Sequence, residues 1–488
     1  MSGWHVALDR GGTFTDVVAT DPDGAVHTTK VLAGEAAEIE ALRHILGARD
    51  LAGLESLRIG TTVATNALLT GDGARTALVT TAGFEDLLVI GHQARPDIFA
   101  LDIARPEPLA ERVIGARERV SARGDVLTLL DLDALRESLV SARRDGVEAV
   151  AIAFAHAVVR PDHEQAVAAL ARELGFPTVV MSHAVSARVG LADRMGAAVA
   201  DARLTPVVEA YVSRVLTAVP ARVSVSFMTS TGGLVSRQRF RGTTALLSGP
   251  AGGAAACERL ARLLDVPAVL GFDMGGTSTD VCRWAGELER REETVLAGRT
   301  LAAPTVDIVS VAAGGGSILA LRDGRACVGP ESAGADPGPA SYGRGGPATV
   351  TDANLVLGRL VPSRFPAVFG PDGAAPLDAA AASRAMQELG VSAAGFLAVA
   401  NEQMAEAIAA LSTARGHDPG DHALVALGGA AGQHACAVAR RLGIRTVLVH
   451  PHAGVLSAWG IAGAPLTARA VRPILAGWTE ETANTHAT

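Results

Sequence analysis

Short apolar runs alternate with amphipathic segments along most of the chain, an order that is typical of an α/β protein. Residues 178–181 and 423–427 are largely apolar and predict buried strands. Apolar residues at helical spacing predict helices elsewhere, and Gly416 and Gly443 mark the ends of two of them. The predicted helices are residues 163–175, 396–415 and 433–442.

Three further segments have a distinctive local pattern. Thr205 followed by Pro206 predicts the start of a helix over residues 205–219, because proline is favoured at the first helical position. Residues 446–468 are apolar but contain prolines, glycines and histidines, so they predict a buried strand, a turn and a small-residue helix rather than a membrane span. Residues 329–347 form a Gly/Pro-rich loop whose length suggests a function.

One nine-residue motif occurs twice, as DRGGTFTDV at residues 9–17 and DMGGTSTDV at residues 273–281. Each copy follows an apolar run, and the first is followed by a short strand, a turn and another strand over residues 25–32. A dinucleotide-binding or P-loop glycine motif would instead open a helix. The motif therefore predicts two loops at the tips of β-hairpins, in two related halves with a boundary near residue 200.

These loops have the chemistry of an anion site. Glycines let the backbone approach phosphate oxygens, and neighbouring N–H and hydroxyl groups can donate to them. Asp9 and Asp273, at the ends of the two preceding strands, could face each other and hold a hydrated Mg²⁺. The simpler alternative, two tight turns that need glycine, is weakened by the duplication. The candidate phosphate contacts are Gly11, Gly12, Thr13, Thr15, Gly275, Gly276, Thr277 and Thr279.

A second glycine-rich segment, residues 426–434, follows the strand 423–427 and opens a helix. Small residues here would let a flat base and its ribose lie against the backbone, with Gly428 and Gly429 as the candidate contacts. A close-packed strand-to-helix turn would need the same residues. The position of this segment after the second loop favours the nucleotide interpretation.

The composition excludes several classes of protein. A net charge of −8 and 3% aromatic residues argue against a nucleic-acid or anionic-membrane binder. Lys30 is the only lysine, so no P-loop lysine motif exists. The four cysteines show no metal-binding spacing, and residues 1–9 lack the pattern of a signal peptide, which together predict a cytoplasmic protein.

The chain resembles the ATP-dependent hydantoinase A / 5-oxoprolinase family, within the actin, Hsp70 and sugar-kinase superfamily. The resemblance covers residues 5 to about 465. It implies a two-lobed α/β fold of actin-like ATPase type, with duplicated ribonuclease H-like domains and a nucleotide cleft between them. The implied lobes are residues 1–200 and 201–465, followed by a short tail, 466–488. The matching segments are residues 9–16, 60–67, 91–97, 247–251, 273–280, 314–317, 329–338, 351–354 and 428–429.

The resemblance implies an ATP-using hydrolase subunit that phosphorylates the carbonyl oxygen of a cyclic amide or imide, of 5-oxoproline or hydantoin type, to promote ring opening. It also implies Mg²⁺ and a B-type partner subunit in a hetero-oligomer. Thr61, Thr62 and Asn66 are candidate substrate contacts, although the threonines could simply cap the following helix. The candidate catalytic residues are Asp9, Asp273 and Arg95. Arg95 could instead form a surface ion pair.

Two other functions remain compatible with the same motifs. One is the ATP-using subunit of an acetone- or acetophenone-type carboxylase, and the other is an ATP-binding assembly subunit without turnover. Members of the family usually continue into a further C-terminal domain, so we expect this chain, which stops soon after Trp478, to be a natural short form, a split subunit or a shortened product. Family members also carry Cys at the position of Ser341, Asn at that of Asp201 and Phe at that of Leu427.

Four more polar residues are weaker candidates. Glu331 and Asp336 could be acid–base or metal groups, but carboxylates that form turns are equally compatible with the sequence. His183 is more readily interpreted as a hydrogen-bonded core or loop histidine than as a catalyst. Asp352 is best explained as the start of a helix.

Overall fold

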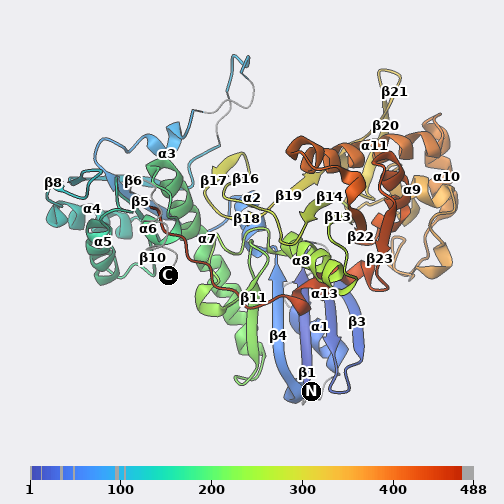
Figure 1. The fold of residues 1–488 in the computed structure, drawn as a ribbon, viewed down its shortest axis with the longest axis horizontal. Helices are drawn as coiled ribbons and strands as arrows, with labels where there is room; N and C mark the ends of the chain where they lie inside the picture. The colour runs from blue at the N-terminus through green and yellow to red at the C-terminus, as the bar shows by residue number, and fades with distance from the viewer. Residues whose placement is uncertain are drawn as a thin grey trace.

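The computed structural model describes residues 3–12, 14–32, 34, 37–47, 50–93, 98–103, 106–365 and 367–474. Figure 1 shows sheets side by side, with helices packed between them and on their outer faces. No helix among these residues is long and apolar enough to cross a membrane. The α/β class and the duplicated sheets agree with the sequence prediction.

The first sheet has the order β12-β11-β4-β1-β2-β3. β1 and β2 form an antiparallel hairpin, β3 continues it, and β4 lies parallel to β1 on the other side. Consecutive residues of β2 are buried on both faces of the sheet, since Val17 and Ala19 belong to one core cluster and Val18 belongs to another. The bounds are β1 Trp4–Arg10, β2 Phe14–Thr20, β3 Val26–Leu32, β4 Leu54–Thr61, β11 Ser224–Met228 and β12 Leu234–Ser236.

A second sheet repeats this plan in the order β19-β14-β13-β22-β23. β13 and β14 form an antiparallel hairpin, and β22 lies parallel to β13 as β4 lies parallel to β1. The two copies of the motif therefore join β1 to β2 and β13 to β14, which confirms the predicted hairpins. The bounds are β13 Val269–Met274, β14 Thr279–Trp284, β19 Ile308–Val311, β22 Ala423–Leu427 and β23 Thr446–Val449.

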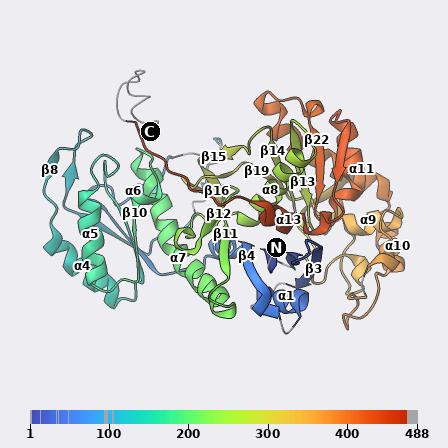
Figure 2. The same ribbon diagram turned by 60° about the horizontal axis from the view of Figure 1, so that its bottom comes forward.

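A third sheet, β10-β9-β5-β6, is parallel throughout. Figure 2 shows it at one end of the molecule with helices α4 and α5. Its apolar strands are buried because helices cover it. The bounds are β5 Thr76–Thr81, β6 Arg112–Ala116, β9 Ala149–Ala153, β10 Thr178–Met181, α4 Leu132–Arg144 and α5 Asp162–Glu173.

Helix α7, Leu191–Ala218, connects the third sheet to the first. The prediction of a helix starting at Thr205 is wrong, because α7 runs continuously through Pro206. Buried side chains along most of its length hold the helix together despite the proline. Residue 200 lies inside α7, and β11 and β12, which follow it, belong to the first sheet. The sheets themselves therefore do not divide at that residue.

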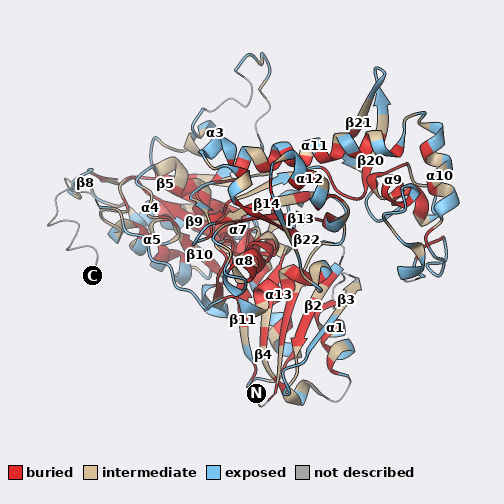
Figure 3. Ribbon diagram, turned by 45° about the vertical axis from the view of Figure 1, so that its right-hand side comes forward, coloured by how far each residue is buried: buried red, intermediate tan, exposed pale blue. Residues whose placement is uncertain are grey.

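Helices α8, Ser248–Leu263, and α13, Leu456–Gly463, pack between the first and second sheets. Their backbones approach closely, since a Cβ on Gly460 would lie 2.2 Å from the carbonyl oxygen of Gly252. Figure 3 shows the buried residues gathered around these helices and the sheets. This helix pair therefore fixes the relative position of the two sheets.

The remaining elements complete the outer layers. The helix predictions near residues 163–175, 396–415 and 433–442 are confirmed by α5, α11 and α12. Residues 446–449 form a strand as predicted, but β23 is a partly exposed edge strand rather than a buried one. The bounds are α1 Ala37–Leu46, α2 Val63–Thr70, α3 Leu87–Ile90, α6 Ser182–Val185, α9 Val350–Val356, α10 Ala379–Glu388, α11 Ala393–Leu411, α12 Ala435–Arg441, β7 Arg119–Val120, β8 Val126–Thr128, β15 Arg290–Arg291, β16 Thr294–Leu296, β17 Arg299–Leu301, β18 Thr305–Val306, β20 Ser317–Arg322 and β21 Arg325–Ser332.

Candidate functional site

The two motif loops have the same turn geometry. The backbone N–H of Gly11 donates to the carbonyl of Phe14 at 2.9 Å, and that of Gly275 donates to the carbonyl of Ser278 at 3.0 Å. Gly12, Gly275 and Gly276 are exposed, so their backbones are accessible to a ligand. The duplication seen in the sequence is therefore a duplication of loop structure.

Helix α8 brings the aspartates of the two loops to one place. A Cβ on Gly249 would lie 3.3 Å from Oδ1 of Asp9, and a Cβ on Gly253 would lie 3.1 Å from Oδ2 of Asp273. Residues four apart share one face of a helix, so both carboxylates lie against the same face of α8. The spacing of these two glycines was a signal in the sequence that the site prediction did not use.

Both carboxyl groups resist ionisation. The pKa of Asp9 is raised to about 6, most of all by burial and also by the charge of Asp16, while the Ser457 hydroxyl and Lys30 lower it. The pKa of Asp273 is raised to about 7, most of all by burial and also by the charges of Asp280 and Asp9. Asp9 and Asp273 are thus close enough to influence each other, and a cation placed between them would relieve the cost of ionising both.

The single lysine of the chain lies in this region. Lys30 faces Asp16 across the β2–β3 pair and forms an ion pair with it. Its charge lowers the pKa of both Asp9 and Asp273. In the second hairpin the residue opposite Asp280 is Ser310, which donates a hydrogen bond of 2.5 Å to that carboxylate. Only the first hairpin therefore provides a cationic side chain at this position.

Two more glycine segments border the second loop. Gly315 and Gly316 donate backbone hydrogen bonds to the carbonyls of Gly275 and Gly276, at 3.0 and 2.6 Å. A Cβ on Gly428 would lie 2.6 Å from Oδ1 of Asp273, so this predicted nucleotide contact adjoins the carboxylate. Gly429 is exposed beside it.

The predicted threonine contacts differ from one another. Thr277 is exposed on the second loop, whereas Thr279 is buried in β14 and donates its hydroxyl proton to the carbonyl of Ala313 at 2.5 Å. Thr15 is buried in β2, and its hydroxyl has no partner among the described residues. Thr13 lies outside the described residues. Thr277 is therefore the threonine of the second loop whose hydroxyl remains accessible.

The predicted substrate residues lie together at the start of α2. Thr61 is buried, and its backbone N–H and carbonyl both bond the hydroxyl of Ser248, at 3.1 and 2.6 Å. Thr62 donates to the carbonyl of Arg10 at 3.3 Å, and the amide of exposed Asn66 donates to the Thr62 hydroxyl at 3.3 Å. Thr61 therefore joins the end of β4 to α8, while Thr62 and Asn66 remain accessible. Arg95 lies outside the described residues.

Other candidates have structural partners. Asp352 accepts hydrogen bonds from the backbone of Ala340, Ser341 and Thr349, and it begins α9 in a capping box, as expected of a helix start. Glu331 forms an exposed ion pair of 2.7 Å with Arg322. Asp336 is exposed. Ser341 and Asp201, the departures from the family pattern, are both buried, and Asp201 accepts from the backbone and hydroxyl of Thr243.

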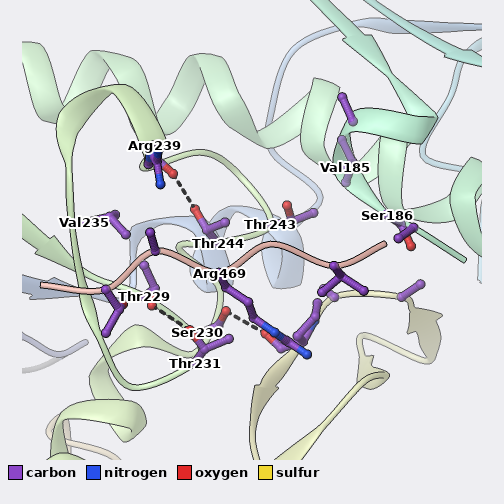
Figure 4. A pocket seen from close by; sticks show the side chains of 18 of the residues that line it. Val185, Ser186, Thr229, Ser230, Thr231, Val235, Arg239, Thr243, Thr244 and Arg469 are labelled. Atoms are coloured by element: carbon purple, nitrogen blue, oxygen red, sulfur yellow. Dashed lines mark hydrogen bonds between the residues drawn. The ribbon is translucent and has the colours of Figure 1, made fainter. Parts of the chain in front are cut away.

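A pocket of about 290 Å³ lies elsewhere, between the third sheet and the turn after β11 (Figure 4). One wall is formed by residues 183–187, another by residues 229–231, 239 and 243–244, and a third by residues 302–304. Residues 467–471, in the extended segment that follows α13, cross it. Of the predicted residues, His183 lines it and the loop residues do not.

The carboxylates fit a magnesium–nucleotide complex. Among the described residues no three or more His, Cys, Asp or Glu side chains converge into a metal cluster. Magnesium bound with a nucleotide needs only one or two carboxylates, since water and phosphate oxygens complete its shell. Oδ1 of Asp9 is buried without a hydrogen-bond partner in the described part of the chain, which leaves an oxygen ligand available.

The sequence matches one family over most of its length. The model described as Hydantoinase/oxoprolinase matches residues 194–470, and that of the hydantoinase/oxoprolinase N-terminal region matches residues 5–175. The protein therefore belongs to the hydantoinase/oxoprolinase family, as the motifs indicated.

The chain covers only part of the length of its relatives. It is 40% identical over 522 residues to the 5-oxoprolinase of Saccharomyces cerevisiae, covering 94% of this chain and 40% of the yeast protein. The chain thus spans about two fifths of the length of the 5-oxoprolinases it matches. The caprolactamase subunit alpha of Pseudomonas jessenii is 33% identical over 94% of this chain and 70% of that subunit.

Solved structures confirm the fold. The crystal structure of the ATP-dependent caprolactamase from Pseudomonas jessenii superposes with a TM-score of 0.82 at 33% identity, covering 94% of this chain and 70% of that chain. The nucleotide-free acetone carboxylase superposes with a TM-score of 0.78 at 24% identity, covering 95% of this chain and 71% of the other. The similarity to acetone carboxylase shows that the two proteins share a fold.

Proposed function

We propose that this chain binds Mg-ATP at the paired loops and transfers the γ-phosphoryl group to the carbonyl oxygen of a cyclic amide or imide of 5-oxoproline or hydantoin type. The observation that carries the proposal is the placement of Asp9 and Asp273 on the glycine face of α8. Family membership and the names of the relatives, 5-oxoprolinase and caprolactamase, support the substrate class.

The roles of the residues follow from their positions. Asp9 and Asp273 would hold the magnesium ion, which neutralises phosphate charge when it is bound. The exposed backbones of Gly12, Gly275 and Gly276 are available to phosphate oxygens. Lys30 adds a positive charge on the side of the first loop. Phosphoryl transfer needs this positioning and charge compensation more than covalent help from the protein.

The nucleotide and the substrate would contact different segments of the chain. Gly428 and Gly429 adjoin Asp273, where small residues leave room for the nucleoside. Thr62 and Asn66 at the start of α2 lie beside Arg10, the residue after Asp9. Thr61 positions this corner through its backbone bonds to Ser248. A substrate held at α2 would thus lie close to the phosphate end of the site.

Phosphorylation makes a poor electrophile reactive. The amide oxygen gains the phosphoryl group and ADP leaves. Water then adds to the carbon, the ring C–N bond breaks, and the nitrogen takes up a proton. A second water releases phosphate and leaves the carboxylate, so the net reaction consumes ATP and two waters. We assign the activation step to this chain and completion of the hydrolysis to a B-type partner subunit, since one relative is named as the alpha subunit of a caprolactamase.

The experiment is the release of ADP by the purified chain with Mg-ATP, measured with 5-oxoproline, hydantoin, caprolactam, or acetone plus bicarbonate. The variant Asp273→Asn serves as the blank. The proposal is supported if a cyclic amide or imide stimulates ADP release by the wild type and not by Asp273→Asn. Stimulation by acetone with bicarbonate alone would identify a carboxylase subunit, and an equally active Asp273→Asn would remove the metal assignment.

A further inference from the structure

The pocket of about 290 Å³ is separate from the site at the paired loops, and nothing assigned so far explains it. Its lining contains no residue of either loop, of α8 or of the segment 426–434. It is nevertheless connected to that site, since the wall at Thr243 and Thr244 leads within a few residues into Ser248, where α8 begins. A ligand in this pocket would therefore contact the segment that leads into the start of α8.

The charges that line the pocket are of one sign. Arg239 and Arg469 line it, and the lining includes no Asp or Glu. Arg469 is paired with Glu292 at 2.5 Å, whereas Arg239 has no ion pair with any described residue. Figure 4 shows Arg239 across the pocket from Val185 and Ser186, with Arg469 on the segment that runs between them. An unpaired guanidinium at a pocket without carboxylates favours a small anion, and most strongly a carboxylate.

His183 supplies a second recognition group. Its Nδ1 lies 2.5 Å from Oε2 of Glu164, which is fully buried. Glu164 also accepts from the hydroxyl of Ser182 at 2.5 Å and from the backbone of Phe154 at 2.9 Å, and the buried guanidinium of Arg194 lies 3.6 Å away. Glu164 thus accepts hydrogen bonds from its other neighbours, and we assign the Nδ1 proton of His183 to the bond with Oε2 of Glu164.

This arrangement determines what His183 can offer a ligand. In the tautomer that carries its proton on Nδ1, the imidazole has a lone pair at Nε2, and Nε2 has no hydrogen-bond partner among the described residues. Nε2 can accept a hydrogen bond from an N–H or O–H group. Backbone turns occupy many of the nearby hydroxyls, as Ser230 donates to the carbonyl of Pro304 at 2.8 Å. His183 and Arg239 are the recognition groups on which the inference rests.

We propose that this pocket binds a small carboxylate-bearing molecule with an N–H donor, in which Arg239 pairs with the carboxylate and Nε2 of His183 accepts the N–H hydrogen bond. Both groups are present in a ring amide that carries a carboxylate. The inference rests on the proposed function for its choice of ligand class. It adds a second site, His183 as a recognition residue, and a preference for anionic over uncharged rings.

The test is ligand binding without nucleotide, by calorimetry or ligand-observed NMR on the full chain. The probes are 5-oxoproline and 2-pyrrolidinone, which share a lactam ring and differ in the carboxylate. Arg239→Gln removes the charge, and Arg237→Gln is its matched control two residues away, outside the pocket lining. His183→Asn keeps a donor toward Glu164 but removes Nε2.

The expected result is that 5-oxoproline binds at least about tenfold more tightly than 2-pyrrolidinone. Arg239→Gln should erase that difference, Arg237→Gln should keep it, and His183→Asn should weaken the binding of both rings. Equal binding of the two probes, no binding of 5-oxoproline at millimolar concentration, or an unchanged Arg239→Gln would overturn the proposal.

The variant Asp273→Asn separates this proposal from the proposed function. It should bind 5-oxoproline as the wild type does, because Asp273 does not line the pocket. Lost binding in this variant would place the ligand at the loops and overturn the pocket assignment. If binding follows the pattern above but no cyclic amide stimulates ADP release, the proposed function fails and the pocket remains.

Discussion

Asp9 and Asp273, which are far apart in the sequence, lie against one face of helix α8, each within 3.3 Å of where a Cβ would stand on Gly249 or Gly253. Any larger side chain at either glycine would press on a carboxylate. The glycines therefore allow two buried acids to approach each other, and the raised pKa values of about 6 and 7 are the electrostatic result.

Replacing Asp273 by Asn should stabilise the free protein at high pH. The pKa of Asp273 is raised from 3.8 to about 7, so the wild type loses stability as pH rises from about 4 to 7, where the unfolded state ionises first. We expect Asp273→Asn to raise the free energy of unfolding by roughly 2 kcal/mol at pH 8 and to change it little at pH 4. Denaturant unfolding at the two pH values measures this.

The control for that prediction is Asp336→Asn, which removes an exposed carboxylate. It should leave the pH dependence of stability unchanged. An Asp273→Asn variant that is less stable than the wild type at pH 8 would show that the ionised carboxylate is well compensated in the free protein. The account of a strained pair of acids would then be wrong.

Lys30 should contact bound nucleotide phosphates. Since it is the only lysine, amine-reactive labelling followed by peptide mass spectrometry reports on this one side chain. We expect Mg-ATP to protect Lys30 from labelling, and we expect Lys30→Met to weaken Mg-ATP binding about tenfold while Lys30→Arg keeps most of it. Thr28→Val, on the same strand, is the control. Equal labelling with and without Mg-ATP would place the phosphates away from β3.

The close contact of α8 and α13 should be sensitive to one methyl group. A Cβ on Gly460 would lie 2.2 Å from the carbonyl oxygen of Gly252 and 2.5 Å from the backbone nitrogen of Ala256. Gly460→Ala should therefore lower the free energy of unfolding by about 2–3 kcal/mol, as overpacking does. Thermal or denaturant unfolding measures the change.

Gly432→Ala is the matched control, because a Cβ there would meet nothing within 4 Å. It should change stability by less than about 0.5 kcal/mol. If Gly460→Ala proved as neutral as this control, the two helices would have room to separate, and they would not fix the position of the sheets.

The sequence predicted correctly those elements that are encoded by a few neighbouring residues. The repeated glycine motif gave the two hairpins, and the apolar runs gave β10 and β22 with their bounds. The Thr205–Pro206 signal failed because tertiary packing kept α7 continuous through the proline. The exposure of β23 followed from its place at a sheet edge, which its own residues do not reveal.

The candidate site was only partly predictable for the same reason. The two aspartates and the glycines of the loops were evident from the repeat, because both copies carry them. The approach of Gly249 and Gly253 to the carboxylates joins segments distant in sequence, and so does the contact of residues 314–316 with the second loop. The pocket beside His183 is lined by residues from several elements, so no single sequence motif predicts it.

The most direct test of a single metal–nucleotide site at the paired loops is calorimetry of preformed Mg-ATP binding at pH 6.5, in two buffers that differ in ionisation enthalpy. Both carboxyl groups are partly protonated at this pH, and a bound cation favours their ionised forms. The account predicts that binding releases protons, and that Asp9→Asn and Asp273→Asn each weaken binding and release fewer protons. Binding and proton release that match the wild type in both variants would contradict it.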